Sequence, residues 1–466
     1  MLALISAVVL ATAIDGDAAL RHASSLAALG PHPWGSPRGA VAAQFVEAEF
    51  RAAGLADVRL QPFTSGGIAG TNVLGVLHGS GGPEFVVLAA HHDTAPDAPG
   101  AYDDGGGVGV LIETARALAR QGRPARTIVF ASFDAEESWS TGKGQTLGSR
   151  AYLASLGPDA RNLVAAFDVE MCGWKGGRPV FHPIAYADPS RQRPYVITPA
   201  WLMRAALSSR AFAVGDPLLS WLYQPAVRTF RIGLYGDDLS FLQGAQPALF
   251  ASDSSFTAFY PWYHQPSDTA DKIDAASLAR MGAGVLAVLD ALGRVPRGPA
   301  SEPDWFAAFG VLVGGTALYA IGFLSLVPLA WRMRRAGGLG TMLGAAHAAV
   351  FLVLLWRHPV PALWVFLLPN VVGRGRRLWL TLVTALPLAA LVALGAIASG
   401  RGYVRGLWLA PWEIALVGFG LALAYAVPAA SGGPAPRRSS GGGGRKRGLP
   451  KGEGKKKAPK KKRPTR

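Results

Sequence analysis

Apolar positions divide the chain into two parts with different periodicities. Between Ala18 and Leu292, short runs rich in Val, Leu, Ile and Phe alternate with segments whose apolar residues recur every three or four positions. The short runs predict strands, and the spaced segments predict helices, the last at Ala275 to Leu292. This alternation predicts an α/β fold with a mixed central sheet and helices on both faces. The predicted strands are Val58 to Pro62, Asn72 to His78, Phe85 to Ala90, Thr127 to Phe133 and Leu163 to Val169.

The C-terminal part is apolar over much longer stretches. Residues 293–304 contain Pro, Gly and both signs of charge, which is typical of a linker. In residues 305–430, almost uncharged segments long enough to cross a bilayer predict an α-helical membrane region of about five spans. The third span is short and could be re-entrant. The five segments are Trp305 to Trp331, Leu339 to Trp356, Val360 to Val372, Leu378 to Ser399 and Leu407 to Ala430.

The two ends of the chain differ from these parts. Residues 1–14 form an uncharged apolar run that predicts a signal peptide or an uncleaved anchor, so that residues 15–292 would form the first domain. Residues 431–466 contain 14 Lys or Arg and one acid, Glu453, and cannot bury a core. These residues are therefore expected to form a disordered polybasic tail. Because the tail follows a final span, we expect it to attract anionic lipid head groups.

The formal net charge of +16 is concentrated in this tail, because the rest of the chain carries only +3. The folded parts therefore give no reason to expect nucleic acid as a partner. The single cysteine, Cys172, excludes an internal disulfide.

Basic residues between the predicted spans indicate their orientation. With five spans, two arginine clusters and the tail fall on one side, which the positive-inside rule assigns to the cytoplasm. The chain is then a multi-pass membrane protein whose first domain is extracytoplasmic. Weaker basic sites, Arg357 with His358 and Arg401 with Arg405, fall on the opposite side. The two clusters are Arg332, Arg334 and Arg335, and Arg374, Arg376 and Arg377.

Acidic and imidazole side chains gather directly after the predicted strands. His91 and Asp93 follow one strand, and the adjacent Glu136 and Glu137 follow another. The carboxyl ends of strands in an α/β sheet form the usual site edge, and imidazole nitrogen and carboxylate oxygen are donors that zinc accepts. Adjacent glutamates repel each other unless a cation or a proton separates their roles. One glutamate as a ligand and the other as a base would resolve that repulsion.

Five motifs of the first domain occur in the order and approximate spacing of the dinuclear zinc aminopeptidases. From about Ala18 to Leu292, the chain is therefore similar to a family that includes aminopeptidase Y, glutamate carboxypeptidase, glutaminyl cyclase and the multi-span endoplasmic-reticulum metallopeptidases. A peptidase domain followed by several spans is similar to the last branch. The motifs are His91-Xaa-Asp93, Gly100-Ala-Tyr-Asp103-Asp104-Gly105, Glu136-Glu137 with Leu147-Gly-Ser-Arg-Ala-Tyr152, Glu170-Met-Cys-Gly173 and Tyr263-His264-Gln-Pro-Ser-Asp268-Thr269.

The resemblance implies two zinc ions per chain, bridged by Asp103. Two nearby cations would lower the pKa of a shared water molecule and polarise a scissile carbonyl. Because the implied carboxylate ligands would repel one another without metal, the cations should also stabilise the fold locally. The implied ligands are His91, Asp103 and Glu170 for one ion, and Asp103, Glu137 and His264 for the other.

The resemblance also implies two supporting roles. Asp93 would orient His91 through its second ring nitrogen, and Glu136 would be the general base. In the family, the peptide bond that corresponds to Asp103-Asp104 is cis.

Three features of the chain complicate the comparison with the family. Glu170 matches the motif register, although strand alternation alone would equally allow Asp168. Residues 138–145 form an insertion that borders the site and could line its rim. Residues 236–241 replace a Ser-Asp-His motif, and Asp237 there could meet a substrate ammonium group or simply cap a loop.

These features predict a membrane-anchored zinc metallo-exopeptidase, an aminopeptidase that removes N-terminal residues from peptides with a water molecule activated by two zinc ions. A glutaminyl-cyclase-like aminoacyltransferase is the alternative enzyme, but that branch works with one metal and tends to lack the second aspartate of the Asp103-Asp104 pair. A non-catalytic scaffold with the same fold would have lost ligands, whereas all five positions are filled here. An accessory domain of a transporter is disfavoured because the spans contain few charged pairs.

Overall fold

The computed structural model describes residues 14–371, apart from 143, 217–218, 234, 256–257, 301, 303, 309–310 and 336, together with 389 and 404–430. Three predicted segments lie outside the described residues, apart from single residues at 14 and 389. They are the N-terminal signal or anchor, the fourth span and the basic tail.

The first domain is built on an eight-stranded mixed sheet in the order β1-β2-β4-β3-β5-β11-β6-β9. β3 runs parallel to β4 and β5, and β5 runs parallel to β11, whereas β1, β2 and β6 pair antiparallel with neighbours. The predicted mixed sheet is therefore confirmed. The strands are β1 (Ala56–Ser65), β2 (Ile68–Leu77), β3 (Phe85–His91), β4 (Thr127–Phe133), β5 (Leu163–Val169), β6 (Val180–Phe181), β9 (Ala213–Val214) and β11 (Ala248–Ser252).

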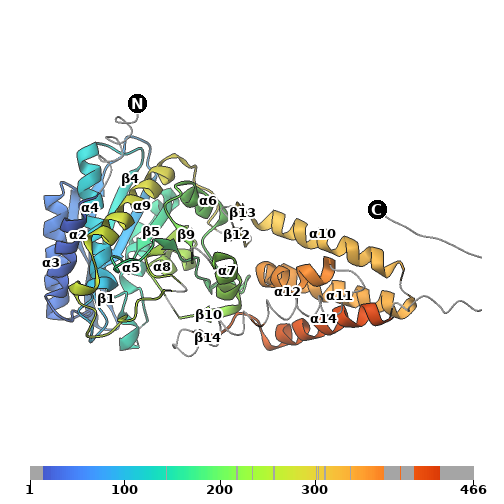
Figure 1. Cartoon of the computed structure of the whole chain (residues 1–466). Coiled ribbons are helices and arrows are strands. Elements are labelled where there is room, and N and C mark those ends of the chain that lie inside the picture. Colours follow the sequence, from blue (N-terminus) through green and yellow to red (C-terminus); the bar gives the residue numbers. More distant parts are fainter. Residues whose placement is uncertain are drawn as a thin grey trace, which may run out of the picture.

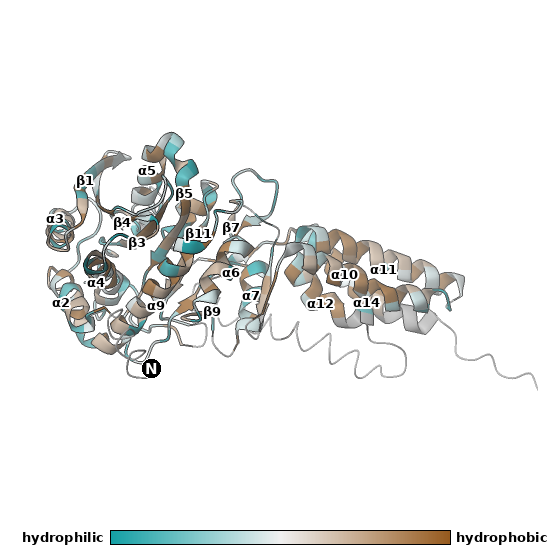
Figure 2. Cartoon of the chain, turned by 90° about the horizontal axis from the view of Figure 1, so that it is seen from above, coloured by the Kyte–Doolittle hydropathy of each residue, from teal (hydrophilic) through white to brown (hydrophobic). Residues whose placement is uncertain are grey.

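Helices cover both faces of this sheet. The helices α2, α4 and α9 pack together on one face, and α5 and α8 lie on the other (Figures 1 and 2). The helices of this domain are α2 (Gly16–Ala27), α3 (Pro37–Ala52), α4 (Gly106–Gln121), α5 (Leu147–Leu156), α6 (Ala200–Ser208), α7 (Ser220–Thr229), α8 (Asp238–Gln243) and α9 (Ala275–Arg294). Shorter elements are the π-helical turn η1 (Ala101–Gly105), the 3-10 turns η2 (Ser138–Thr141), η3 (Gly157–Asn162) and η4 (Ala270–Lys272), and the strands β7 (Tyr186–Ala187), β8 (Tyr195–Val196) and β10 (Phe230–Ile232).

Burial explains why the central strands have continuous apolar sequences. Every residue of β3, β5 and β11 is buried, because helices cover both faces of the sheet at its centre. The peripheral β1 instead has no buried residue. The sheet therefore fixes the carboxyl ends of β3, β4 and β5 side by side.

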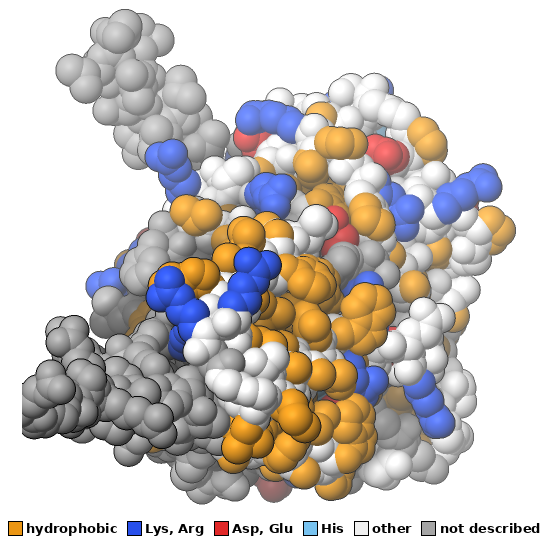
Figure 3. Space-filling view, turned by 90° about the vertical axis from the view of Figure 1, so that its right-hand side faces the viewer, with side chains coloured by type: hydrophobic (Ala, Val, Ile, Leu, Met, Phe, Trp, Pro, Cys, Tyr) orange, Lys and Arg blue, Asp and Glu red, His pale blue; other side chains and the backbone are white. Residues whose placement is uncertain are grey.

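The C-terminal part is a bundle of apolar helices that extends away from the first domain (Figures 1 and 2). Many large apolar side chains are exposed on it, including Leu324, Met342 and Trp356. Figure 3 shows such side chains gathered on this face of the molecule, with Lys and Arg side chains among them. The elements are β12 (Phe306–Ala308), β13 (Val311–Val313), α10 (Gly315–Met333), α11 (Gly338–Arg357), α12 (Pro359–Val371), β14 (Val404–Leu407) and α14 (Pro411–Ala430).

Among the described residues, three helices are long and apolar enough to cross a membrane: α9, α10 and α11. The helix α9 packs against α2, α4 and α6 inside the first domain, so its apolar face is part of the core of that domain. The spans predicted at Leu339 to Trp356 and Val360 to Val372 coincide with α11 and α12 within one residue.

The first predicted span begins too early. Trp305 is fully buried in the core of the first domain, where its indole donates a hydrogen bond of 2.7 Å to the carbonyl oxygen of Thr198. The helix α10 begins only at Gly315, after the β12–β13 hairpin. The fifth span was predicted to begin at Leu407, which is the last residue of β14, whereas the helix α14 begins at Pro411.

The segment before α14 returns to the first domain. The strand β14 pairs antiparallel with β10, with Phe230 opposite Leu407 and Ile232 opposite Val404. The indole ring of Trp408 contacts the ring of Tyr195 in a tilted orientation. The guanidinium group of Arg231 lies over the same indole ring. The bundle and the first domain therefore share a strand pair as well as a covalent connection.

Candidate metal centre

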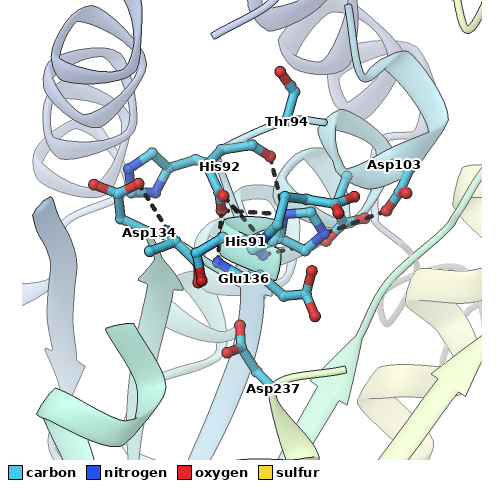
Figure 4. Close-up of polar contacts among 12 residues, drawn as sticks. His91, His92, Thr94, Asp103, Asp134, Glu136 and Asp237 are labelled. Carbon is cyan, nitrogen blue, oxygen red and sulfur yellow. Dashed lines mark hydrogen bonds and ion pairs between the residues drawn. The ribbon is translucent and has the colours of Figure 1, made fainter. Parts of the chain in front are cut away.

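Three parallel strands bring most of the predicted site residues to one edge of the sheet. His91 is the last residue of β3, Glu136 and Glu137 follow β4, and Glu170 follows β5. Because β3 lies between β4 and β5, the three strand ends are neighbours. Figure 4 shows Glu136 and His91 extending into the same space at this edge.

Two further segments complete the site. Asp103 lies in η1, immediately before α4, and His264 lies in the loop that follows β11. His264 has a positive φ of 57°. Both segments reach the edge of the sheet at which β3 and β5 end, although they are far apart in sequence.

The first group of donors consists of His91, Asp103 and Glu170. One ligand atom of each lies within 4.8 Å of the others, and all three side chains are buried. The Nε2 atom of His91 lies 3.3 Å from Oδ1 of Asp103. This is the first of the two ligand sets that the resemblance implied.

The second group consists of Asp103, Glu137 and His264, again within 4.8 Å of one another. The Nε2 atom of His264 lies 2.6 Å from Oε1 of Glu137 and 3.2 Å from Oδ2 of Asp103. Asp103 thus directs one oxygen toward each imidazole and belongs to both groups. The structure therefore brings together all five predicted metal ligands.

Asp93 holds the neighbouring groups in place. Its two carboxylate oxygens accept hydrogen bonds of 3.0 Å from the backbone N–H groups of Glu136 and Glu137. Its carbonyl oxygen lies 3.0 Å from Nδ1 of His91, and its Oδ1 lies 3.5 Å from the same nitrogen. A proton on Nδ1 would satisfy these oxygens and leave Nε2 free to bind a cation. Asp93 therefore contacts His91 as predicted and also fixes the glutamate pair.

Asp104 ties three segments together at the base of the site. Its carboxylate accepts hydrogen bonds from the backbone N–H groups of His91 (3.3 Å), Gly107 (2.9 Å) and Met171 (3.1 Å). The peptide bond between Asp103 and Asp104 is cis, as the resemblance implied. A Cβ at Gly107 would lie 2.3 Å from the Asp104 carboxylate, so only glycine fits there. The sequence motif contained Asp104 but gave no reason for its position.

Glu170, and not Asp168, joins His91 and Asp103 in the first group. Asp168 lies in another buried group, with Asp237 and the shared Glu170, and its Oδ2 accepts a hydrogen bond of 3.0 Å from the backbone N–H of Asp238. The geometry therefore agrees with the motif register. Asp237 extends toward Glu136 (Figure 4) and is fully buried, and its contact with a substrate ammonium group stays a prediction.

The charges of the site depend strongly on one another. Burial, and then the charge of Glu137, raise the pKa of Glu136 well above its usual range. Burial likewise raises the pKa of Glu170, and the charge of Asp168 adds to this effect. Burial opposes the positive charge of His264, yet attraction by Glu137 and Asp103 raises its pKa to about 10. The clustered carboxylates therefore favour positive charge in the site. When no cation is bound, protons on these side chains supply it.

The residues present fit a pair of divalent cations. Two imidazoles and three carboxylates form two overlapping donor sets of the nitrogen and oxygen type that zinc accepts. Among the described residues, Nε2 of His264 has no partner in hydrogen-bonding geometry, although two carboxylate oxygens lie close to it. A shared cation would satisfy that nitrogen and both oxygens at once.

Two aromatic rings enclose His264 and were not assigned a role from the sequence. The ring of Tyr263 stacks on it with centroids 3.7 Å apart, and the half-exposed indole of Trp139 stacks at 5.6 Å. The indole N–H of Trp139 also donates a hydrogen bond to Oε2 of Glu137. Trp139 belongs to η2 in the insertion predicted to form part of the rim.

Asp268 was also not assigned a role. It accepts hydrogen bonds from the backbone N–H groups of Tyr102 (2.9 Å) and Asp103 (3.3 Å) and from the hydroxyl of Tyr260 (2.8 Å). It therefore fixes the turn that carries the shared ligand. Its place in the Tyr263 to Thr269 motif was the available signal. By contrast, His92 is bonded to Ser132 and lies outside both groups, as predicted.

Comparisons with known proteins agree with this geometry. The described residues place two overlapping donor sets at the carboxyl edge of an α/β sheet, an arrangement typical of metallopeptidases. Residues 72–289 match Peptidase family M28. This range contains all five predicted ligands, and the match confirms the resemblance based on the motifs.

Individual relatives match over stretches of similar length. Uncharacterized protein YfbL of Escherichia coli is 28% identical over 222 residues, which are 44% of this chain and 66% of that protein. Endoplasmic reticulum metallopeptidase 1 of Rattus norvegicus is 27% identical over 230 residues, 47% of this chain and 22% of that protein. Probable lipoprotein aminopeptidase LpqL of Mycobacterium tuberculosis is 25% identical over 245 residues, 50% of this chain and 47% of that protein. The chain thus spans less than two thirds of these relatives.

Proposed function

We propose that this chain is a membrane-anchored aminopeptidase that hydrolyses N-terminal residues from peptides with two zinc ions. The observation that carries the proposal is the pair of buried donor groups that share Asp103. The match to Peptidase family M28 supports hydrolysis of peptides, and the similarity to a probable lipoprotein aminopeptidase supports the N-terminal site of cleavage. Two complete donor sets and the presence of Asp104 favour this function over a one-metal glutaminyl cyclase.

Glu136 is the carboxylate best placed to act as general base. It is adjacent to Glu137, and its negative charge raises the pKa of Glu170. It nevertheless belongs to neither donor group. Bound cations would supply Lewis acidity for the carbonyl and for the attacking water. Glu136 would accept the proton of that water and return it to the leaving amine. Asp93 would keep Glu136 in place through the backbone hydrogen bond already described.

The experiment that tests this function compares Glu136→Gln with the unaltered full-length protein. We expect the substitution to leave bound zinc near two ions per chain, because Glu136 is not in either donor group. Hydrolysis of aminoacyl chromogenic substrates should fall by at least about 100-fold, the usual contribution of a general base. Zinc is measured by elemental analysis, and kcat and KM are measured on the same preparation.

A matched control is Glu84→Gln, which makes the same chemical change just before β3, at a side chain paired with Arg126. We expect its zinc content and kcat/KM to stay unchanged. Turnover of E136Q equal to that of the control would remove Glu136 from the reaction. A protein that binds a single zinc ion and releases no amino acid would favour the cyclase instead.

The apolar bundle supports membrane attachment. We infer that the bundle is embedded in the bilayer, because α10 and α11 are long and apolar enough to cross it and the shorter apolar helices α12 and α14 pack against them. Similarity to a protein named vacuolar membrane protease supports this inference. The first domain is then on one side of the membrane and, by the charge rule, on the extracytoplasmic side. The basic tail is proposed to contact anionic lipid head groups on the other side.

A further inference from the structure

A cavity of about 660 Å³ lies where the first domain meets the helical bundle. One wall is the loop that contains Asp188 and Arg193, and another is the connection that contains Glu302. The remaining wall comes from the bundle, through Tyr319 of α10 and Trp356 of α11. Its volume is in the range of small-molecule sites.

The bundle contributes aromatic residues to the cavity at the ends of two helices. Tyr319 lies in the second turn of α10, and Trp356 is the penultimate residue of α11, both at the ends that face the first domain. Trp356 is 77% exposed. Tyrosine and tryptophan are enriched where spans leave the hydrocarbon region. If these helices cross the bilayer, as proposed above, the cavity opens at its surface.

The charges around the cavity have both signs. Two of the lining charges are neutralised by partners outside it: Asp304 pairs with Arg228 at 2.6 Å, and Arg357 pairs with Glu413. The charges that are left belong to Arg193, Asp188 and Glu302.

The remaining cation is available to a ligand. The guanidinium group of Arg193 donates to the backbone carbonyl of Glu302 at 2.5 Å and forms no ion pair with a carboxylate in the described part of the chain. The side chain of Glu302 accepts one hydrogen bond there, at Oε2 from the backbone N–H of Trp201. A cation on one wall and an anion on another therefore line the cavity with donor and acceptor capacity left.

We propose that this cavity binds the phosphoethanolamine head group of a phospholipid. Arg193 would receive the phosphate, and Glu302 with Asp188 would receive the ammonium group. A head group that carries both charges matches the cavity better than phosphatidylglycerol, which lacks the cation. The exposed ring of Trp356 would lie beside the glycerol and acyl chains. The proposal rests on the membrane placement stated under the proposed function.

The test uses the full-length protein in detergent, with thermal unfolding followed by tryptophan fluorescence while phosphatidylethanolamine or phosphatidylglycerol is added. We expect phosphatidylethanolamine to raise Tm at lower concentration than phosphatidylglycerol. R193Q should raise the half-saturating concentration about tenfold, the effect of one lost charge-assisted contact. E302Q, which keeps an oxygen for Trp201, should remove the preference between the two lipids.

Control variants and probes decide between the outcomes. R191Q alters an exposed arginine of the same loop that does not line the cavity, so its lipid response should equal that of the unaltered chain. Soluble phosphoethanolamine and inorganic phosphate separate a lipid site from a simple phosphate site, because stabilisation by phosphate alone would contradict the proposal. Equal responses of R193Q and R191Q would also overturn it.

The same preparations distinguish this proposal from the function on which it rests. Carbonate extraction of membranes shows whether the chain is integral, and release of the chain would overturn both the membrane placement and the lipid site. An integral protein that hydrolyses aminoacyl substrates yet shows no lipid preference would remove the head-group site alone. The R193Q variant is expected to keep its hydrolysis in detergent, because Arg193 is not part of the metal centre.

Discussion

Asp103 belongs to both groups of candidate metal ligands. Its Oδ1 faces His91 and its Oδ2 faces His264, so a single carboxylate links both donor groups. The backbone N–H of Asp103 is held by Asp268, and the next residue is held by three backbone donors. This rigidity places the shared ligand before any cation arrives, which lowers the ordering cost of binding.

Glu170 and Asp168 provide a ranking test of the ligand set. We expect Glu170→Gln to lose about one zinc ion per chain, because Glu170 completes the group with His91 and Asp103. Asp168→Asn should retain more metal, since Asp168 bonds to the backbone of Asp238 and burial raises its pKa to about 6. Zinc per chain is measured for both variants after dialysis against a weak chelator.

The two substitutions are matched, because each replaces a buried carboxylate by its amide. Far-UV circular dichroism excludes unfolding as the cause of metal loss. A greater loss of zinc in D168N than in E170Q would reverse the assignment of the ligand and contradict the geometry of the first group.

The insertion after Glu137 forms part of the wall of the site. Trp139 covers one face of His264 and bonds to Glu137, so it touches two ligands of the second group. We expect Trp139→Ala to weaken zinc binding at that group by about tenfold, because groups that orient metal ligands usually contribute that much. Competition with a fluorescent chelator measures the two zinc affinities.

The Phe variant at the same position separates the two contacts of Trp139. W139F keeps an aromatic ring for stacking on His264 but removes the N–H donor. An affinity of W139F close to that of W139A would assign the effect to the hydrogen bond, and an affinity close to that of the unaltered chain would assign it to stacking. No change in W139A would show that Trp139 does not support the second group.

The first five strands of the sheet could be predicted from sequence, whereas the later strands could not. The predicted strands Thr127 to Phe133 and Leu163 to Val169 coincide with β4 and β5, because strands buried on both faces have continuous apolar runs. The five-residue strand β11, the two-residue strands β6 and β9 and the strand pair β10–β14 were missed. Such short strands have no periodicity of their own and depend on distant partners.

The same limit applies to the site and to the spans. All five ligand positions followed from motifs, but the contact between Trp139 and His264 did not, since it arises within an insertion. Hydropathy also placed Trp305 in a membrane span. A core helix or strand and a span use the same apolar residues, and only packing against Thr198 and its neighbours separates them.

At the scale of the molecule, the helix ends show which segments lie at the end of the bundle that faces the first domain. The beginning of α10, the end of α11 and the strand β14 all lie next to the first domain (Figure 1). The end of α14 lies away from it (Figure 1). If these helices cross the bilayer, the first domain and the residues after α14 are on opposite sides.

A reporter fused after Arg466 tests this arrangement. We expect alkaline phosphatase, which is active only outside the cytoplasm, to be inactive there, and a fluorescent protein that matures in the cytoplasm to be bright. A second fusion of the same reporters within residues 400–403 should give the reverse result, because that position adjoins β14. Phosphatase activity at the C-terminal fusion would refute the proposed orientation.

The β10–β14 pair also has a consequence for the order in which the protein is made. More than a third of the chain separates the two strands, so the ribosome completes β10 long before its partner emerges. Until then the edge of β10 has no partner from β14, and closing so long a loop is a slow step. The return of residues 404–407 to β10 therefore comes late in biogenesis, after all strands of the eight-stranded sheet have been made.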